Sequence, residues 1–121
     1  MNVEPIFEPG GRVAGWLRSD VVFDRECRPL GFMRGERVFD FAGTYRGLLD
    51  RGFFRDARGD AVAFVRDATG GPIPLFPEVP ERPPAAGKVP PVPAVPPVLP
   101  MPPIPSLKWS RLSWFEFLTG S

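Results

Sequence analysis

The sequence predicts an all-β protein built from four repeated β-hairpins, followed by a proline-rich segment and a short C-terminal helix. Four consecutive blocks of 16 residues, from Ile6 to Thr69, share one pattern: IFEPGGRVAGWLRSDV, VFDRECRPLGFMRGER, VFDFAGTYRGLLDRGF and FRDARGDAVAFVRDAT. A fixed period indicates an array of one supersecondary unit. We therefore divide the chain into a β-repeat domain at residues 1–71, a proline-rich segment at 72–105 and an aromatic C-terminal segment at 106–121.

Each block reads as a hairpin because its third and sixth positions carry the residues of a tight turn. Asp at the first position and Gly at the fourth are typical of a type I turn, in which the carboxylate caps nearby amides and the Gly takes a positive φ. Two apolar runs flank each turn, so the blocks predict about eight strands in a meander or flower arrangement. The predicted turn residues are Asp24, Asp40, Gly43, Asp56 and Gly59. Cys27 holds a position where the other blocks have Gly, which predicts either a strained turn or a different one.

Two further columns of the repeat predict how the hairpins pack. The tenth position is Gly15, Gly31, Gly47 and Ala63. Glycine inside a strand usually marks the close approach of another backbone, so we expect the hairpins to crowd there. The eleventh position is Trp16, Phe32, Leu48 and Phe64, which we expect to be buried together. The fourth block departs from the pattern at Arg55, where the others have Phe, as terminal repeats often do.

The proline-rich segment has a regular order. Residues 72–105 hold 15 of the 18 prolines, and aliphatic residues recur there with a period of three, at Val89, Val92, Val95, Val98, Met101, Ile104 and Leu107. Polyproline II has three residues per turn, so these side chains would form one apolar edge, which we call the aliphatic edge. We expect it to be buried against the β-units or against copies of itself. A solvated spacer and a ligand for SH3-like grooves are the alternatives.

The C-terminal segment predicts a helix of two or three turns at most. Ser113 and Glu116 match a capping box, and Gly120 is suited to end the helix. So short a helix must dock on something to be stable. Trp109 and Trp114 therefore either close the β-core of their own chain or dock into another subunit or partner.

The order of these motifs resembles a known family. The Asp-x-x-Gly hairpins, Gly52-Phe53-Phe54-Arg55-Asp56, Ala61-Val62-Ala63-Phe64, Gly70-Gly71-Pro72, the aliphatic-Pro-Pro triplets and Trp109-Ser110-x-x-Ser113-Trp114 occur here in the order seen in the bacterial "4-fold beta flower" family. The resemblance covers nearly the whole chain. It implies a flower-like arrangement of four β-hairpins. It implies no activity, cofactor or catalytic residue.

Composition argues against several classes of function. The chain has 15 basic and 14 acidic residues, one cysteine and no histidine. A neutral balance does not suit nucleic-acid binding, and the commonest general base and metal ligand is missing. The carboxylates of Glu8, Asp24, Asp40 and Asp56 could be drawn as a calcium ring, but turn capping explains their spacing. We expect no enzymatic activity, no cofactor and no metal site. No signal peptide and no membrane-spanning run is recognisable, which predicts a cytoplasmic protein.

These observations favour a non-enzymatic structural or protein-interaction module. We expect it to form a homo-oligomer or to bind another protein through the proline-rich rod and the aromatic C-terminus. The expected contact residues are Val92, Val95, Val98, Met101, Trp109 and Trp114. The alternative is a small-ligand-binding protein, with an aromatic pocket at the centre of the repeats lined by Trp16, Phe32 and Phe64.

Overall fold

The computed structural model describes residues 3–72 and 103–120, and it shows an all-β fold with one short helix. The strands are β1 Val3–Phe7, β2 Val13–Arg18, β3 Val21–Asp24, β4 Pro29–Arg34, β5 Arg37–Asp40, β6 Tyr45–Asp50, β7 Phe53–Arg55 and β8 Ala61–Phe64. The helix is α1 Trp114–Thr119. The predictions for Val92, Val95, Val98 and Met101 lie outside the described residues.

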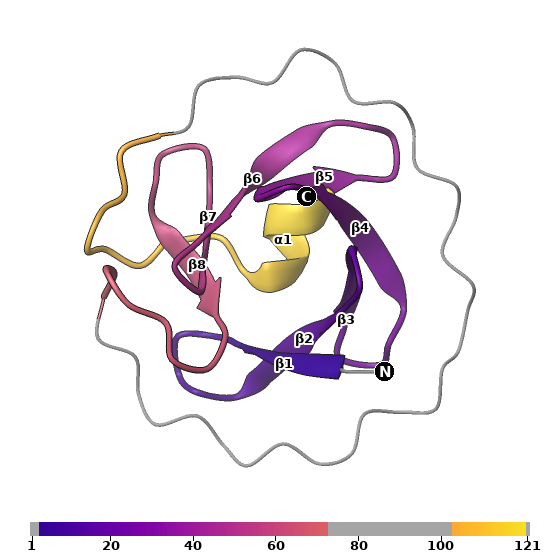
Figure 1. Cartoon of the computed structure of the whole chain (residues 1–121), viewed down its shortest axis with the longest axis horizontal. Coiled ribbons are helices and arrows are strands. Elements are labelled where there is room, and N and C mark those ends of the chain that lie inside the picture. Colours follow the sequence, from indigo (N-terminus) through magenta and orange to yellow (C-terminus); the bar gives the residue numbers. More distant parts are fainter. Residues whose placement is uncertain (1–2, 73–102, 121) are drawn as a thin grey trace.

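The eight strands form a closed antiparallel barrel in chain order (Figure 1). Each repeat contributes one hairpin: β1–β2, β3–β4, β5–β6 and β7–β8. The last strand returns to the first at Phe7, which pairs with Phe64, the one residue pair assigned to this seam between the described strands. Closure removes the free sheet edges that a meander would leave at its two ends.

The hairpin turns follow the sequence prediction. At the third turn, the amide of Gly43 donates to the carbonyl oxygen of Asp40 at 3.0 Å, and the amide of Asp40 donates to that of Thr44 at 3.0 Å. The Asp40 carboxylate accepts from the amides of Ala42 and Thr44 at 3.0 and 2.9 Å. Gly43 has a φ of 88°, so both the predicted cap and the predicted positive φ are confirmed.

Cys27 keeps the same turn at the cost of backbone strain. Its φ is 63°, in the left-handed region that favours glycine. Its amide still donates to the carbonyl oxygen of Asp24 at 3.1 Å, and the Asp24 carboxylate accepts from the amides of Glu26 and Arg28. Of the two outcomes that the sequence left open, a strained turn of the same type is therefore the one observed.

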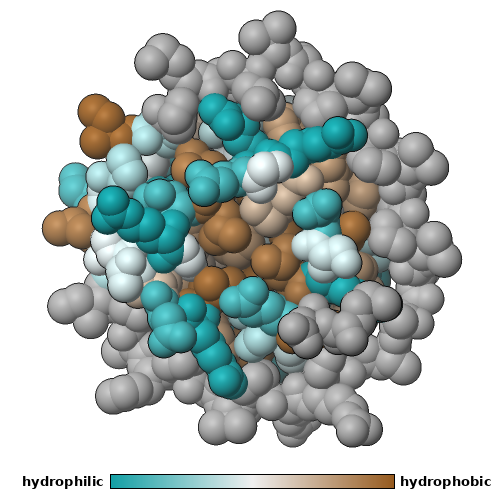
Figure 2. Space-filling view, in the orientation of Figure 1, coloured by the Kyte–Doolittle hydropathy of each residue, from teal (hydrophilic) through white to brown (hydrophobic). Residues whose placement is uncertain are grey.

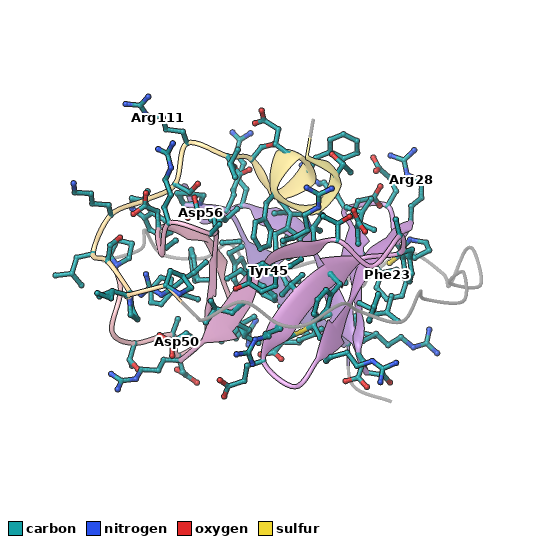
Figure 3. The ribbon with its side chains drawn as sticks, turned by 90° about the horizontal axis from the view of Figure 1, so that it is seen from above. Phe23, Arg28, Tyr45, Asp50, Asp56 and Arg111 are labelled. Carbon is teal, nitrogen blue, oxygen red and sulfur yellow. The ribbon has the colours of Figure 1, made fainter. Side chains whose placement is uncertain are left out.

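The barrel interior is filled by the first residue of every repeat together with α1. Ile6, Val22 and Val38 are fully buried and share one core cluster with Phe54 and with Trp114, Phe117 and Leu118 of the helix. In Figure 1 the helix projects into the middle of the ring of strands, and in Figure 3 it lies across one end of the barrel. The labelled turn residues Arg28 and Asp56 are at that same end, whereas Asp50 is at the other.

The glycine column explains how the helix fits so close to the strands. A Cβ atom at Gly47 would overlap the carbonyl oxygen of Arg55 on the adjacent hairpin and lie 2.6 Å from the ring of Phe117. A Cβ atom at Gly15 would overlap the carbonyl oxygen of Phe23 and lie 2.6 Å from Nε1 of Trp114. The predicted crowding of the hairpins is confirmed, and the helix packs onto the same column.

The eleventh column is buried, but its side chains do not face a common axis. Trp16 and Phe64 belong to a second cluster, apart from the one that contains the helix. Phe32 stacks on Phe39 with ring centroids 5.5 Å apart. Because neighbouring side chains on a strand point to opposite faces, Phe32 faces away from the interior side taken by Met33. The idea that these side chains line one central pocket is therefore corrected.

The helix begins and ends as the sequence predicts. Ser113 Oγ accepts from the amide of Glu116 at 3.1 Å, and the Glu116 carboxylate accepts from the amide of Ser113 at 3.0 Å. Gly120 follows with a φ of 77° and donates its amide to the carbonyl oxygen of Glu116. Arg46 of β6 donates to the carbonyl oxygen of Thr119 at 3.3 Å, which places a cation at the negative end of the helix.

Candidate functional site

Residues 103–112 run alongside the fourth hairpin, and this segment is the first part of the candidate site. The amide of Ala61 donates to the carbonyl oxygen of Lys108 at 3.0 Å, and the amide of Ser110 donates to that of Ala61 at 2.7 Å. Ala61 and Trp109 thus form an isolated parallel bridge. The backbone of Ser106 is tied in the same way to Gly59 at 3.1 Å. The segment is therefore a fixed part of the surface.

Arg55 binds the backbone of this segment through its buried side chain. Its side chain is fully buried, and Nη1 donates to the carbonyl oxygens of Gly59 and Ser106 at 2.6 and 2.8 Å. Nη2 donates to the carbonyl oxygen of Gly70 at 2.9 Å. Burial lowers the pKa of Arg55, although the nearby charge of Asp50, 3.7 Å from Nε, opposes that effect. One buried cation thereby joins the residues on both sides of the proline-rich segment.

The fourth turn is anchored to the same segment by two hydroxyl groups. Asp56 caps its own turn by accepting from the amides of Arg58 and Asp60 at 2.9 and 3.1 Å. Its second carboxylate oxygen accepts from Ser110 Oγ at 2.6 Å. Asp60 likewise accepts from Ser106 Oγ at 2.7 Å. The predicted turn role of Asp56 is confirmed, and the structure adds this contact with the C-terminal segment. Gly59 has a φ of 88°, as predicted for its turn position.

The two tryptophans of this segment pack on their own chain. Trp114 is buried, its Nε1 donates to the carbonyl oxygen of Phe23 at 3.2 Å, and its ring lies 4.9 Å from that of Phe54. Trp109 is half-buried and packs against Phe53 and Phe64, with both centroid distances 6.1 Å. Closure of the chain's own core, one of the two predicted roles, is therefore observed. Trp114 is not at the surface for a second subunit.

Other hydrophobic side chains of the same segment are exposed. The large hydrophobic side chains with high exposure in the described part of the chain are Ile104 at 87%, Leu107 at 73%, Phe115 at 53% and Leu112 at 40%. In Figure 2, hydrophobic side chains stand out from the left edge, where residues 103–110 run in Figure 1. Ile104 and Leu107 are the two described members of the predicted aliphatic edge. Within residues 3–72, no strand has a large hydrophobic side chain that is exposed to this degree.

An open cavity of about 670 Å³ lies between the fourth turn and the C-terminal segment. We call it the turn groove. Its lining residues are Asp56, Ala57, Arg58, Asp60, Lys108, Trp109, Ser110, Arg111 and Leu112. Arg58, Lys108 and Arg111 are exposed. The turn groove thus combines apolar surface from Trp109 and Leu112 with three cations.

In the described part of the chain, the remaining reactive groups do not form a second site. Burial, together with the negative charge of Asp24, raises the pKa of the Cys27 thiol, which therefore stays protonated at neutral pH. Burial also raises the pKa of Tyr45, whose buried hydroxyl has no hydrogen-bond partner among the described residues. Residues 3–72 and 103–120 contain no group of three or more side chains suited to hold a metal ion. Over the same residues, no helix is long and apolar enough to cross a membrane.

Sequence reasoning missed the exposed face of α1 and the role of Arg55. The exposed face of α1 could have been predicted, because helical periodicity puts Trp114, Phe117 and Leu118 on one side of the helix and Phe115 on another. Arg55 stood out as a departure from the repeat. Its partners Gly70 and Ser106 lie 15 and 51 residues away, however, and no local pattern names them.

Comparison with known proteins agrees with this architecture. A search of curated proteins and a search of solved structures each gave no match. A family model described as "4-fold beta flower protein" matches residues 4–118, which include all four hairpins and nearly the whole helix. With four repeats closed into one barrel around a helix, the chain belongs to the 4-fold beta flower family.

Proposed function

We propose that the chain is a non-enzymatic protein-interaction module that self-associates through its aliphatic edge and the exposed face of its C-terminal segment. One observation carries the proposal: Ile104, Leu107, Leu112 and Phe115, the highly exposed large hydrophobic side chains of the described residues, all lie between residues 104 and 115. Exposed apolar side chains that cluster on one segment are typical of protein-protein contacts.

The aliphatic edge favours self-association as the type of contact. Ile104 and Leu107 continue the period of three that runs from Val89, and both are largely exposed. An edge that ends in exposed aliphatic side chains is suited to pack against a copy of itself. Small domains also gain stability from association because they bury a smaller share of their surface alone.

Sedimentation velocity over a range of concentrations tests self-association. The wild type should sediment as a dimer or larger assembly. An Ile104→Ser/Leu107→Ser variant should shift to monomer. A Val92→Ser/Val95→Ser/Val98→Ser variant, which keeps every proline, should do the same.

The matched control is Arg66→Ser/Thr69→Ser, which changes two exposed polar side chains after the fourth hairpin. It should leave the assembly unchanged. The proposal would be contradicted if the wild type were monomeric at every concentration. It would also be contradicted if both sets of serine substitutions left the size of the assembly unchanged.

A further inference from the structure

The turn groove is a cavity of a size that ligands use, and its two walls are held in place. Pockets for ligands typically enclose about 300–1,000 Å³, and this one encloses about 670 Å³. One wall is the fourth turn, and the other is the segment from Lys108 to Leu112. Ser110 ties the walls together through its bond to Asp56. The groove is therefore already formed before a partner binds.

The acidic groups of the groove keep their charge, but they are hydrogen-bonded and less exposed than its cations: Asp56 is buried and Asp60 is half-buried. Asp56 accepts two turn amides through one oxygen and Ser110 Oγ through the other. Asp60 accepts from Ser106 Oγ. Among the described residues, Arg58, Lys108 and Arg111 take part in no ion pair. The three cations outnumber the two carboxylates and are the exposed charges of the groove, so the side chains that meet a partner are mainly positive.

The placement of these cations on two walls suits an extended partner. Arg58 belongs to one wall, and Lys108 and Arg111 belong to the other. Arg111 extends away from the barrel in Figure 3, at the end of the molecule where Asp56 lies. The cations therefore come from both walls of the groove. Several carboxylates on one extended chain can pair with cations on both walls.

We propose that the turn groove binds an extended acidic peptide segment of a partner protein. Carboxylates of that segment pair with Arg58, Lys108 and Arg111, and an apolar side chain packs on Trp109 and Leu112. This contact shares Leu112 with the exposed face of the C-terminal segment, but it does not involve Ile104 or Leu107 and does not require self-association. It adds a second type of partner to the interaction module.

Fluorescence anisotropy with a defined probe tests the proposal. The probe is a fluorescein-labelled peptide of alternating Glu and Leu, and its reference is the same peptide with Gln in place of every Glu. The Glu peptide should bind more tightly, and added salt should weaken it. The variant Arg58→Gln/Lys108→Gln/Arg111→Gln should lose about tenfold in affinity, as expected for three exposed ion pairs.

The matched control is Arg12→Gln/Arg25→Gln/Arg34→Gln, which removes the same charge from exposed arginines outside the groove. It should bind the Glu peptide as the wild type does. Equal losses in both triple variants would mean a non-specific charge effect and would overturn the proposal. So would equal binding of the Gln peptide, or tighter binding of a thymidine oligonucleotide, which would indicate a nucleic-acid surface. The groove variant should still sediment as the wild type does, so failure here is separable from failure of self-association.

Discussion

The guanidinium of Arg55 donates a hydrogen bond of 2.8 Å to the carbonyl oxygen of Ser106, 51 residues further along the chain. The same side chain donates to Gly70, just before the proline-rich segment. The first three repeats have Phe at the equivalent position. The fourth repeat therefore departs from the pattern where the chain leaves the barrel and where it returns.

Restoring the repeat residue at this position should destabilise the protein. In Arg55→Phe, the carbonyl oxygens of Gly59, Gly70 and Ser106 lose the hydrogen bonds from this buried side chain, and we expect a loss of about 3 kcal/mol or more in the free energy of unfolding. Urea denaturation measures it. The control Arg58→Phe changes an exposed arginine of the neighbouring turn and should cost less than about 1 kcal/mol. If the two variants unfold at the same urea concentration, Arg55 is not a structural anchor.

A methyl group at Gly47 should disrupt the contact between β6, β7 and the helix. The new Cβ would overlap the carbonyl oxygen of Arg55 and press on Phe117, so Gly47→Ala should cost about 2–3 kcal/mol. The control Gly10→Ala places its Cβ 3.8 Å from a Glu8 carboxylate oxygen, in open surroundings, and should be nearly neutral. Thermal melting of both variants checks this pair. Equal melting temperatures would show that the helix does not rely on the glycine column.

Truncation of Phe32 should reveal that the outward face of the strands contributes strongly to stability. Phe32 is 3% exposed and lies within 5.9 Å of the Phe41 ring, centroid to centroid. Phe32→Ala should lower the free energy of unfolding by about 3–5 kcal/mol. Phe115→Ala removes the same side chain from a half-exposed helix position and should cost less than about 1 kcal/mol. Similar losses in a denaturant titration would contradict the burial difference.

Stability should depend on pH through Asp40. Burial of this carboxyl raises its pKa, but hydrogen bonds from Thr44, Arg46 and Ala42 outweigh burial, and the pKa is lowered overall. A carboxyl with a lowered folded pKa stabilises the fold above its unfolded pKa of about 3.9, and the contribution disappears as pH falls through the folded value. Asp40→Asn should therefore be less stable than the wild type at about pH 7 and approach it at about pH 3. A difference that stays constant over this range would exclude the mechanism.

The hairpins and their turns could be predicted from the sequence because the signals are local. Asp40 and Gly43 are three residues apart and define their turn without help from the rest of the chain. The helix caps at Ser113 and Gly120 are equally local. The 16-residue period also indicated which columns are buried.

Two features could not be predicted in the same way: the closure of the barrel, and the side of the sheet to which the side chains at each repeat position point. A repeat of hairpins is compatible with an open sheet, a sandwich or a closed ring, and the choice depends on strand tilt and register across hairpins. The eleventh column was expected to share an axis because equivalent positions look alike in sequence. The axis is instead filled by the first column and by α1, whose place depends on contacts far from it in the chain, such as the bond from Trp114 to Phe23.

The position of α1 after all eight strands has a consequence for synthesis of the protein. Local hairpins form quickly, because little chain has to be ordered before their contacts are made. The first and last strands of the ring pair only at Phe7 and Phe64, and its core lacks the side chains of Trp114, Phe117 and Leu118 until residues 114–119 have left the ribosome. A nascent chain that ends before Trp114 should therefore be an open meander with exposed apolar faces, vulnerable to proteases and to pairing with its neighbours. Synthesis of α1 thus sets the moment at which the core of the barrel is complete.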